Sequence, residues 1–172
     1  MCYHTLCNNA NGGKTLMAEK KTVFLTGASG HMGWAGFKEL YSKKDKLNIV
    51  LLLRDSEKNR KKFANYLNDP SVKIVWGDLK KYDDVLKCVE GSDYVLHVGG
   101  MVSPSADYYP TKTIQTNTTA AKNIVDAVKA QPNKDDIKVV YIGTVAQTTE
   151  TLLSIGQEPV TRLKSASTIT MR

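Results

Sequence analysis

A glycine-rich stretch directly after a short apolar run constrains the fold of this chain more than any other feature. Residues 22–25 read Thr-Val-Phe-Leu, and residues 26–33 read Thr-Gly-Ala-Ser-Gly-His-Met-Gly. Between a strand and a helix, this spacing permits a tight turn at Gly27, a close approach of the backbone to a phosphate at Gly30, and close helix–sheet contact at Gly33. Because a helix N-terminus offers unpaired N–H groups and a positive dipole end, the pattern predicts a site for a dinucleotide pyrophosphate. The alternative is a glycine-rich turn without a ligand.

The surroundings of this loop favour the first interpretation. Strand-like apolar runs alternate with helical patterns, so we expect strands at 22–25, 48–53, 72–75, 93–98 and 138–142, and helices at 31–44, 56–67, 81–89 and 112–130. Several runs are almost continuously apolar, as in strands covered on both faces. The alternation predicts an α/β fold, a Rossmann-type doubly wound parallel sheet of about five strands in the order 3-2-1-4-5. At the first strand–helix junction of such a sheet the loop is expected to bind a dinucleotide, with the Ser29 hydroxyl as a further donor.

Length and composition exclude several other classes. A chain of 172 residues with 41% hydrophobic and 24% charged residues fits one globular domain. No apolar run approaches the ~20 residues of a membrane span, and the first residues lack a signal-peptide pattern. The three cysteines are odd in number and have no metal-ligand spacing. We therefore expect no metal site, and we expect the cysteines to be free thiols in a reducing, cytoplasmic compartment.

The net charge of +7 could indicate a nucleic-acid partner. The basic residues are dispersed, however, apart from a cluster within residues 54–62, and no DNA- or RNA-binding motif accompanies that cluster. We therefore expect no nucleic acid as a partner. The cluster is interpreted as a solvated helix face, with local phosphate binding as the alternative.

The residue at the end of the second predicted strand bears on the choice of dinucleotide. A ribose-binding acid at this position would favour NAD, but the residue here is Arg54, followed by Asp55. A guanidinium can pair with a 2′-phosphate through two hydrogen bonds, and Lys58 and Arg60 are near enough in sequence to assist. We favour NADP as the cofactor, with NAD as the alternative. Arg54 could also merely end the strand, with Asp55 and Ser56 capping the next helix.

These motifs together resemble the extended short-chain dehydrogenase/reductase family, of the NAD(P)-dependent epimerase/dehydratase type. The resemblance covers about residues 21–147. The motifs on which it rests are residues 26–33, Gly77-Asp78-Leu79 after the third strand, residues 93–100 at the fourth strand, Asn117-Thr118-Thr119 in the long helix, and residues 140–146 at the fifth strand. It implies that residues 17–147 form an NAD(P)-binding Rossmann domain. It also implies that His31 and Met32 lie against the cofactor together with the loop glycines.

The resemblance implies cofactor contacts outside the glycine loop as well. Asp78 would accept a hydrogen bond from the adenine amino group, and Leu79 would lie beside the ring. Val98 and Gly99 would line the nicotinamide side, although the family often has alanine there. The alternative for Asp78 is a cap for the helix expected at 81–89.

Two further positions match residues near the active site of the family. Asn117 would hold a water molecule or a main-chain carbonyl, but an asparagine on an apolar helix stripe needs a buried partner in any case. Thr144 stands where a hydroxyl residue would hydrogen-bond the substrate oxygen, and a threonine at a strand end is otherwise common. Gly143 departs from the serine often found before it.

The chemistry that the family implies is hydride transfer at a nicotinamide, with a tyrosine as acid/base and a lysine four residues later. Of the eight tyrosines, only Tyr108 has a lysine at that spacing, Lys112. Pro110 lies between them and both precede the long helix, so they cannot share a helix interior. The catalytic Tyr-Lys pair is therefore absent from this sequence.

The two ends of the sequence differ from its middle. Residues 1–16 lack periodicity and are interpreted as a non-native or disordered extension, and residues 148–172 form an atypical tail with neither period. With permitted codons, the neighbouring reading frame of the tail gives a string similar to what family members carry before their Tyr-x-x-x-Lys. We hypothesise a frameshift near residues 148–153, which would leave the C-terminal substrate lobe missing. A genuine, unusual C-terminal segment is the alternative.

The sequence thus predicts the dinucleotide-binding domain of a reductase, epimerase or dehydratase, in a chain that is catalytically incomplete. The full-length parent would act on a carbonyl or hydroxyl group of a small molecule or nucleotide-sugar. A non-catalytic dinucleotide-binding module or sensor is the alternative. Because family members often dimerise through helices, the resemblance also implies a homodimer.

Overall fold

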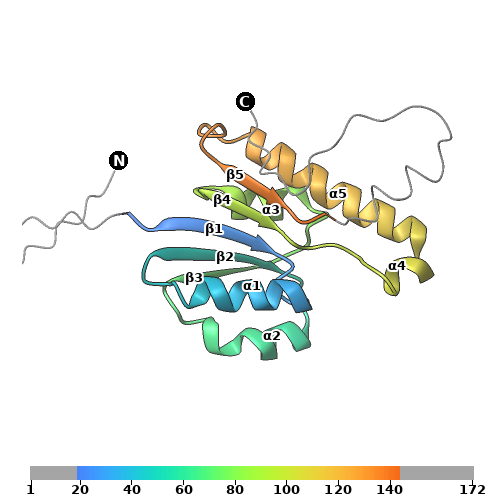
Figure 1. Ribbon diagram of the computed structural model, residues 1–172, viewed down its shortest axis with the longest axis horizontal. Helices are drawn as coiled ribbons and strands as arrows, with labels where there is room; N and C mark the ends of the chain where they lie inside the picture. The colour runs from blue at the N-terminus through green and yellow to red at the C-terminus, as the bar shows by residue number, and fades with distance from the viewer. Residues whose placement is uncertain (1–18, 144–172) are drawn as a thin grey trace, which may run out of the picture.

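The computed structural model describes residues 19–143, which form one parallel sheet with helices on both faces (Figure 1). The five strands are β1 (Lys21–Thr26), β2 (Leu47–Leu53), β3 (Val72–Trp76), β4 (Tyr94–His97) and β5 (Lys138–Tyr141). Their spatial order is β3-β2-β1-β4-β5, and every neighbouring pair is parallel. The predicted fold class and strand order are confirmed.

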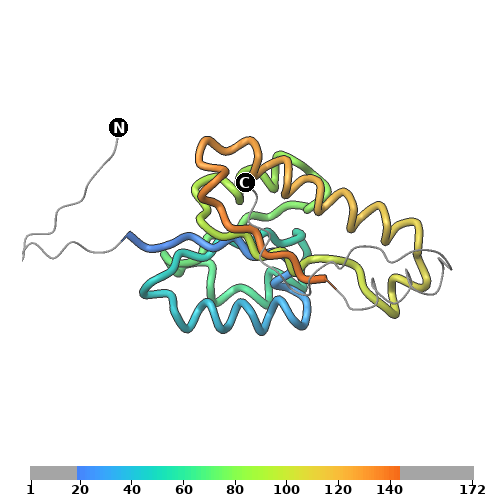
Figure 2. The backbone as a smooth tube through the Cα atoms, turned by 45° about the horizontal axis from the view of Figure 1, so that its top comes forward, coloured from blue at the N-terminus to red at the C-terminus, as the bar shows by residue number. Residues whose placement is uncertain are grey.

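The helices are α1 (His31–Tyr41), α2 (Glu57–Phe63), α3 (Tyr82–Val89), α4 (Ser105–Tyr108) and α5 (Pro110–Lys129), and a 3₁₀ turn, η1 (Ala64–Tyr66), follows α2. Helices α1 and α2 cover one face of the sheet, and α3 and α5 cover the other (Figure 1). Figure 2 shows that α4 and the first turns of α5 project beyond the ends of the strands. The projecting segment therefore borders the carboxyl edge of the sheet.

Strand β2 explains why the central apolar runs are continuous. Ile49, Leu51 and Leu53 belong to the core between the sheet and α1 and α2, whereas Val50 and Leu52 belong to the core on the α3 and α5 side. Successive side chains of a strand point to opposite faces. Because both faces of β2 are covered, each of these five positions is buried and apolar.

Aromatic side chains fill the core beside α1 and α2. The Phe37 ring lies 5.6 Å from the Phe63 ring and 4.8 Å from the Tyr66 ring, measured between centroids. The Trp34 ring meets Phe63 edge-on at 5.4 Å. Such contacts add to the burial of large apolar surface, so α1, which follows the glycine loop, is fixed against the sheet along its length.

The predicted helices are all present, with differences at their ends. The first ends at Tyr41 and not at residue 44, and the second changes at Phe63 to the 3₁₀ turn, in which the Leu67 amide donates to the Ala64 carbonyl at 3.4 Å. The long helix begins at Pro110 because proline suits the first helical position. The short helix α4 was not predicted, since its four residues are too few for a periodic pattern.

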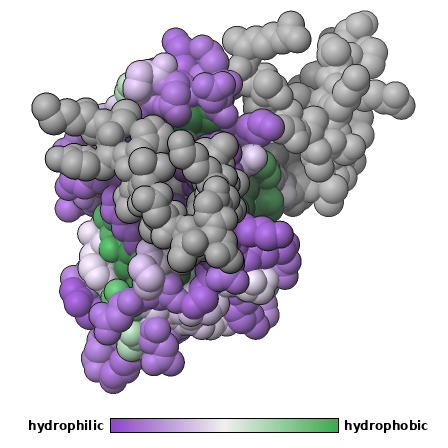
Figure 3. Space-filling view, turned by 90° about the vertical axis from the view of Figure 1, so that its left-hand side faces the viewer, coloured by the Kyte–Doolittle hydropathy of each residue, from purple (hydrophilic) through white to green (hydrophobic). Residues whose placement is uncertain are grey.

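The surface at the end of the sheet where the strands begin is visible in Figure 3. Figure 3 views the molecule from that end, and the described surface there is mostly hydrophilic with small hydrophobic areas.

Within residues 19–143, no helix combines the length and apolar character needed to cross a membrane.

Candidate dinucleotide-binding site

The described pocket has a volume of about 450 Å³ and lies where the strands end, the usual position of ligands in open parallel α/β sheets. All eleven residues predicted to contact the cofactor line it: Gly27, Ser29, Gly30, His31, Met32, Gly33, Arg54, Asp78, Leu79, Val98 and Gly99. These residues come from four different segments of the chain. Their contacts with a cofactor stay a prediction, but the structure brings every one of them to the same cleft.

The glycine loop needs glycine for two separate reasons. Gly27 has a φ angle of +73°, and a Cβ atom there would lie 2.7 Å from the Gly99 backbone. A Cβ atom on Gly33 would lie 2.0 Å from the Gly27 carbonyl oxygen, which is far inside contact distance. The start of α1 therefore packs directly on the loop, and the loop packs directly on the segment after β4.

The N-terminus of α1 is open toward the pocket. Its N-cap residue, Gly30, has no side chain to accept from the first-turn amides, and the first turn contains no acidic residue. These amides point beyond the helix end, where partial positive charge attracts anions. The uncapped amides and the absence of a Cβ atom at Gly30 fit a pyrophosphate group.

A lysine from α2 supports the loop from its far side. The Lys62 ammonium group donates to the Ser29 carbonyl oxygen at 3.0 Å and lies 4.3 Å from the centre of the Trp34 ring. Partial burial, and secondly the charge of Lys58, lower the pKa of Lys62. Sequence analysis did not identify this residue as part of the site.

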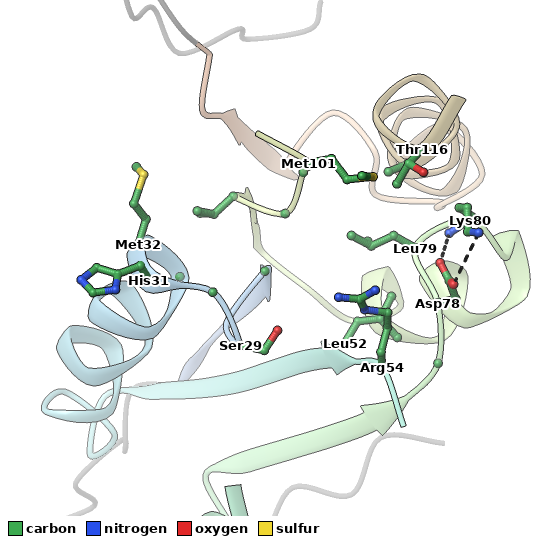
Figure 4. Close-up of a pocket in the computed structure, with 18 of the residues that line it drawn as sticks. Ser29, His31, Met32, Leu52, Arg54, Asp78, Leu79, Lys80, Met101 and Thr116 are labelled. Atoms are coloured by element: carbon green, nitrogen blue, oxygen red, sulfur yellow. Dashed lines mark hydrogen bonds and ion pairs between the residues drawn. The ribbon is translucent and has the colours of Figure 1, made fainter. Parts of the chain in front are cut away.

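The basic residues near the end of β2 differ in whether their side chains are free to bind a ligand. The Arg54 side chain points into the pocket (Figure 4), and no carboxylate within residues 19–143 lies in ion-pair distance of it. Arg60 instead makes two hydrogen bonds to Asp55, of 2.6 and 2.8 Å, and stacks on Trp76. These hydrogen bonds lower the pKa of Asp55 and raise that of Arg60.

This arrangement revises two expectations from the sequence. Arg60 was expected to assist Arg54 in binding a phosphate, but its guanidinium group is already paired with Asp55. The alternative, in which Asp55 caps α2 together with Ser56, is wrong for Asp55. Ser56 alone is the N-cap and accepts from the Asn59 amide at 3.2 Å, because Asp55 is turned toward Arg60.

Asp78 and Leu79 lie in a turn between β3 and α3, which we call the 77–80 turn. The Asp78 carboxylate accepts a hydrogen bond of 2.9 Å from the Lys80 amide and lies 4.0 Å from the Lys80 ammonium group (Figure 4). The alternative of a helix cap is wrong, because the N-cap residue of α3 is Lys81 and no side-chain cap bond is present. The carboxylate belongs to the pocket wall.

A buried hydrogen-bond network fixes the opposite wall. The Thr26 hydroxyl accepts from the amides of Val98, at 3.1 Å, and Gly99, at 2.9 Å. Its own proton therefore goes to the His97 Nδ1 atom, which lies 2.8 Å away. This pattern requires a neutral imidazole with its proton on Nε2. Burial also lowers the pKa of His97 to about 4.

Of the two residues expected near the reacting atoms, Asn117 and Thr144, the structure describes only Asn117. The Asn117 side chain accepts from the Met101 amide at 2.8 Å and donates to the Met101 carbonyl at 3.0 Å. It thus contacts the main chain beside the pocket but does not itself line it. Thr144 lies outside the described residues, as do residues 1–16 and 148–172.

The Tyr108–Lys112 spacing gives no catalytic pair. Tyr108 ends α4, its side chain is 78% exposed, and it does not line the pocket. Lys112 is in α5 and does line it. Tyr109 separates the two helices and Pro110 begins α5, so the expectation that both residues precede the long helix is wrong for Lys112, although the two still belong to different helices.

Several lining residues were missed by sequence analysis. They are Leu52, Gly77, Lys80, Gly100, Met101, Lys112, Thr116 and Ala120. Lys112, Thr116 and Ala120 are spaced by four residues on α5, which places them on one side of that helix. That spacing was the available signal, but it could not be interpreted without knowing that α5 rises beyond the sheet.

Fold and pocket together define a nucleotide-binding domain of the Rossmann class. The model of the NAD dependent epimerase/dehydratase family matches residues 23–164. The chain therefore belongs to this family, and the resemblance stated from the sequence is confirmed.

The curated relatives are longer proteins. The UDP-glucose 4-epimerases of Rickettsia bellii (strain RML369-C) and Rickettsia felis are 32% and 30% identical to this chain over 128 residues. In both cases the match covers 72% of this chain and 36% of the relative. The chain thus spans about a third of the length of these relatives.

Solved structures agree on the fold. A short-chain dehydrogenase/reductase of the glucose/ribitol dehydrogenase type from Brucella melitensis has a TM-score of 0.60 at 25% identity, covering 75% of this chain and 58% of that one. UDP-glucose 4-epimerase from Bifidobacterium longum, in complex with NAD⁺ and UDP, has a TM-score of 0.57 at 17% identity, covering 73% and 37%.

Two glycines of α1 allow a matched test of the backbone contact. Gly33→Ala should destabilise the fold by more than ~3 kcal/mol, because its Cβ atom would overlap the Gly27 carbonyl. Gly36→Ala, where nothing lies within 4 Å of the added atom, should stabilise it by roughly 0.5–1 kcal/mol. Urea unfolding measures both. Equal effects of the two substitutions would contradict the packing described here.

The buried His97 should make stability depend on pH. The pKa of His97 falls from 6.5 in an exposed chain to about 4 here, so the unfolded chain binds a proton in this window and the native protein does not. The unfolding free energy should therefore fall by roughly 2–3 kcal/mol between pH 7.5 and pH 4.5. His97→Asn, which can still accept from Thr26, should lose this contribution. Unfolding curves with the same pH dependence in both proteins would exclude it.

Proposed function

We propose that this chain binds NADP(H) through the pocket at the carboxyl edge of its sheet. The observation that carries the proposal is the uncapped N-terminus of α1, which follows a loop whose backbone touches both α1 and the segment after β4. A pyrophosphate above these amides would be held by several N–H donors and by the helix dipole. The position of Arg54 in the same pocket supports NADP over NAD, because its guanidinium group is available for a 2′-phosphate.

The remaining contacts follow from the two walls of the pocket. Asp78 and Leu79 would receive the adenine, and Val98 and Gly99 would face the nicotinamide. The hydrogen bonds of Thr26 hold the amides of Val98 and Gly99 in place. When bound, the dinucleotide supplies hydride transfer, and the contribution of these residues is to orient it.

For the parent protein we propose oxidation and reduction at a carbonyl or hydroxyl group of a nucleotide-sugar or another small molecule. The names of the curated relatives, UDP-glucose 4-epimerases, support the nucleotide-sugar. We further propose that this chain by itself is catalytically incomplete, because its only Tyr-x-x-x-Lys spacing, Tyr108–Lys112, is divided between two helices. The same observation favours a second candidate function, a dinucleotide-binding module or sensor without turnover.

A charge placed on the glycine loop tests the pyrophosphate site. The φ angle of Gly30 is −76°, which any residue can adopt, and aspartate is a favourable N-cap residue. A Cβ atom at Gly30 would lie 3.3 Å from the Gly27 carbonyl oxygen, a tight contact, so Gly30→Asp should fold with at most a small loss of stability. Its carboxylate would repel a pyrophosphate by about 4 kcal/mol at ~4 Å, a loss of affinity of more than 100-fold. Titration with NADPH, followed by nicotinamide fluorescence, measures this.

Gly30→Asn is the matched neutral control, since it adds the same volume without the charge and should retain more affinity. The site is refuted if Gly30→Asp binds NADPH as tightly as the wild type. Turnover of NADPH with carbonyl substrates by the wild-type chain would refute catalytic incompleteness but leave the binding proposal intact.

The two arginines near β2 allow a test of cofactor choice. The wild type should bind NADPH more tightly than NADH. Arg54→Gln should weaken NADPH binding by about 10- to 100-fold through the loss of a charge-assisted contact, while NADH binding changes little. Arg60→Gln should leave the NADPH/NADH ratio unchanged, because Arg60 is paired with Asp55. Fluorescence titration of the three proteins measures these affinities, and an unchanged NADPH/NADH ratio in Arg54→Gln would show that Arg54 does not contact a 2′-phosphate.

A further inference from the structure

The 77–80 turn is held at both ends by side chains that do not line the pocket. At its first end, the Asp84 carboxylate accepts a hydrogen bond of 3.1 Å from the Asp78 amide. At its other end, the Asn123 amide group donates a hydrogen bond of 2.8 Å to the Leu79 carbonyl oxygen. The two side chains come from different helices, α3 and α5. Together they fix the peptide groups on either side of the Asp78 and Leu79 side chains.

Asp84 reaches back from the first turn of α3. A Cβ atom on Gly77 would lie 2.5 Å from an Asp84 carboxylate oxygen, so glycine at position 77 leaves room for this contact. The Gly77 amide is itself bound to the Leu53 carbonyl at 2.9 Å. The turn therefore begins at a fixed point on the edge of the sheet, and Asp84 determines how the chain leaves that point.

Asn123 is a polar residue in an apolar setting. Its side chain is 8% exposed, and the neighbouring α5 positions Ala120, Ile124 and Ala127 are buried in the core. A buried amide without a partner would be unfavourable, and its partner here is the Leu79 carbonyl, 44 residues earlier in the chain. Asn123 thus joins the long helix directly to the pocket wall.

The position of Leu79 matters for both walls of the pocket. A Cβ atom on Gly99 would lie 2.9 Å from the Leu79 Cδ1 atom, so the Leu79 side chain rests against the Gly99 backbone. Gly99 in turn is held by Thr26 at 2.9 Å. A shift of the 77–80 turn would move Leu79 away from this contact and widen the pocket between β3 and β4.

We propose that Asn123 and Asp84 are positioning residues for the adenosine half of a bound dinucleotide. The inference rests on the proposed function, since it presupposes that a dinucleotide occupies the pocket. A turn that already has its bound geometry does not lose conformational freedom when the ligand binds, and this raises the affinity. The role is specific to one half of the ligand, because the hydrogen bonds of the two side chains go to the 77–80 turn and not to the glycine loop.

The test compares two buried side-chain amides, Asn123 within α5 and Gln131 just beyond its C-terminus. Asn123→Leu removes the donor to Leu79 at similar volume. Gln131→Leu removes a similar hydrogen bond, from the Gln131 side chain to the Ala127 carbonyl oxygen at 3.0 Å. Gln131 is 9% exposed and does not line the pocket. NADPH, ADP-ribose and reduced nicotinamide mononucleotide are the probes, with binding measured at a temperature where circular dichroism shows every variant folded.

Asn123→Leu should weaken NADPH and ADP-ribose binding by about tenfold and change the binding of the mononucleotide by less than about twofold. Gln131→Leu should leave all three affinities unchanged. The inference is overturned if Asn123→Leu binds ADP-ribose as tightly as the wild type. It is also overturned if both variants, or both halves of the dinucleotide, show the same loss, because the effect would then be on the fold as a whole.

Asp84→Ala is a second substitution, at a more exposed position, and it should also weaken ADP-ribose binding more than mononucleotide binding. It replaces Asn123→Leu in the test if that variant does not fold. A wild-type chain that binds neither NADPH nor ADP-ribose would refute the proposed function, and the inference with it. A wild type that binds both, with Asp84→Ala unaffected, would refute the positioning role alone.

Discussion

Close backbone contact at the carboxyl ends of β1 and β4 is the constraint on which the site depends. The Gly27 peptide lies against Gly99 on one side and against Gly33 on the other, and a Cβ atom at Gly27 or Gly33 would come within 2.7 Å of backbone atoms. Glycine is required because no other residue lets three segments of main chain approach so closely. The approach brings the start of α1 directly above the end of β1. A side chain at either position would push α1 away and turn its free amides from the pocket.

The two hydrophobic cores keep this contact in place. On one face, the aromatic rings of Trp34 and Phe37 pack α1 against Phe63 of α2. On the other face, α5 packs Ile124 and Val128 into the core that contains Phe24 of β1. Because β1 contributes Phe24 to one core and Leu25 to the other, neither face can shift without moving the strand that leads into the glycine loop. The geometry of the loop is therefore a property of the whole sheet.

The fold could be predicted from the sequence because the information for it is local. The alternation of strand and helix patterns gave the class, and the position of the glycine loop identified the first strand–helix junction. The bounds were less accurate where hydrogen bonding and not periodicity decides the end of an element, as at Tyr41 and Phe63. Helix α4 follows a strand end and contains four residues, so it had no period to detect.

Residues of the pocket could be named from the sequence where the residue type alone suggests a role, but not where a role depends on a partner elsewhere in the chain. Asn117 and Asn123 carry the same signal, a polar residue among apolar positions of one helix, yet the first was identified through the family motif and the second was not. Asn123 could be interpreted only when the Leu79 carbonyl was seen beside it. Asp84 presents the same difficulty, because an acidic residue in a first helical turn is common and its bond to the Asp78 amide depends on the shape of the turn.

The basic residues within 54–62 show that charges close together in the sequence need not act together in space. The basic cluster within residues 54–62 could have been a nucleic-acid surface, a solvated helix face or a phosphate site. In the structure its members separate: Arg60 pairs with Asp55, Lys61 pairs with Glu57, and Lys62 binds the Ser29 carbonyl. Only Arg54 of the cluster lines the described pocket. The cluster thus contributes one cation to the cleft, and carboxylates and a carbonyl oxygen bind three of its other four side chains.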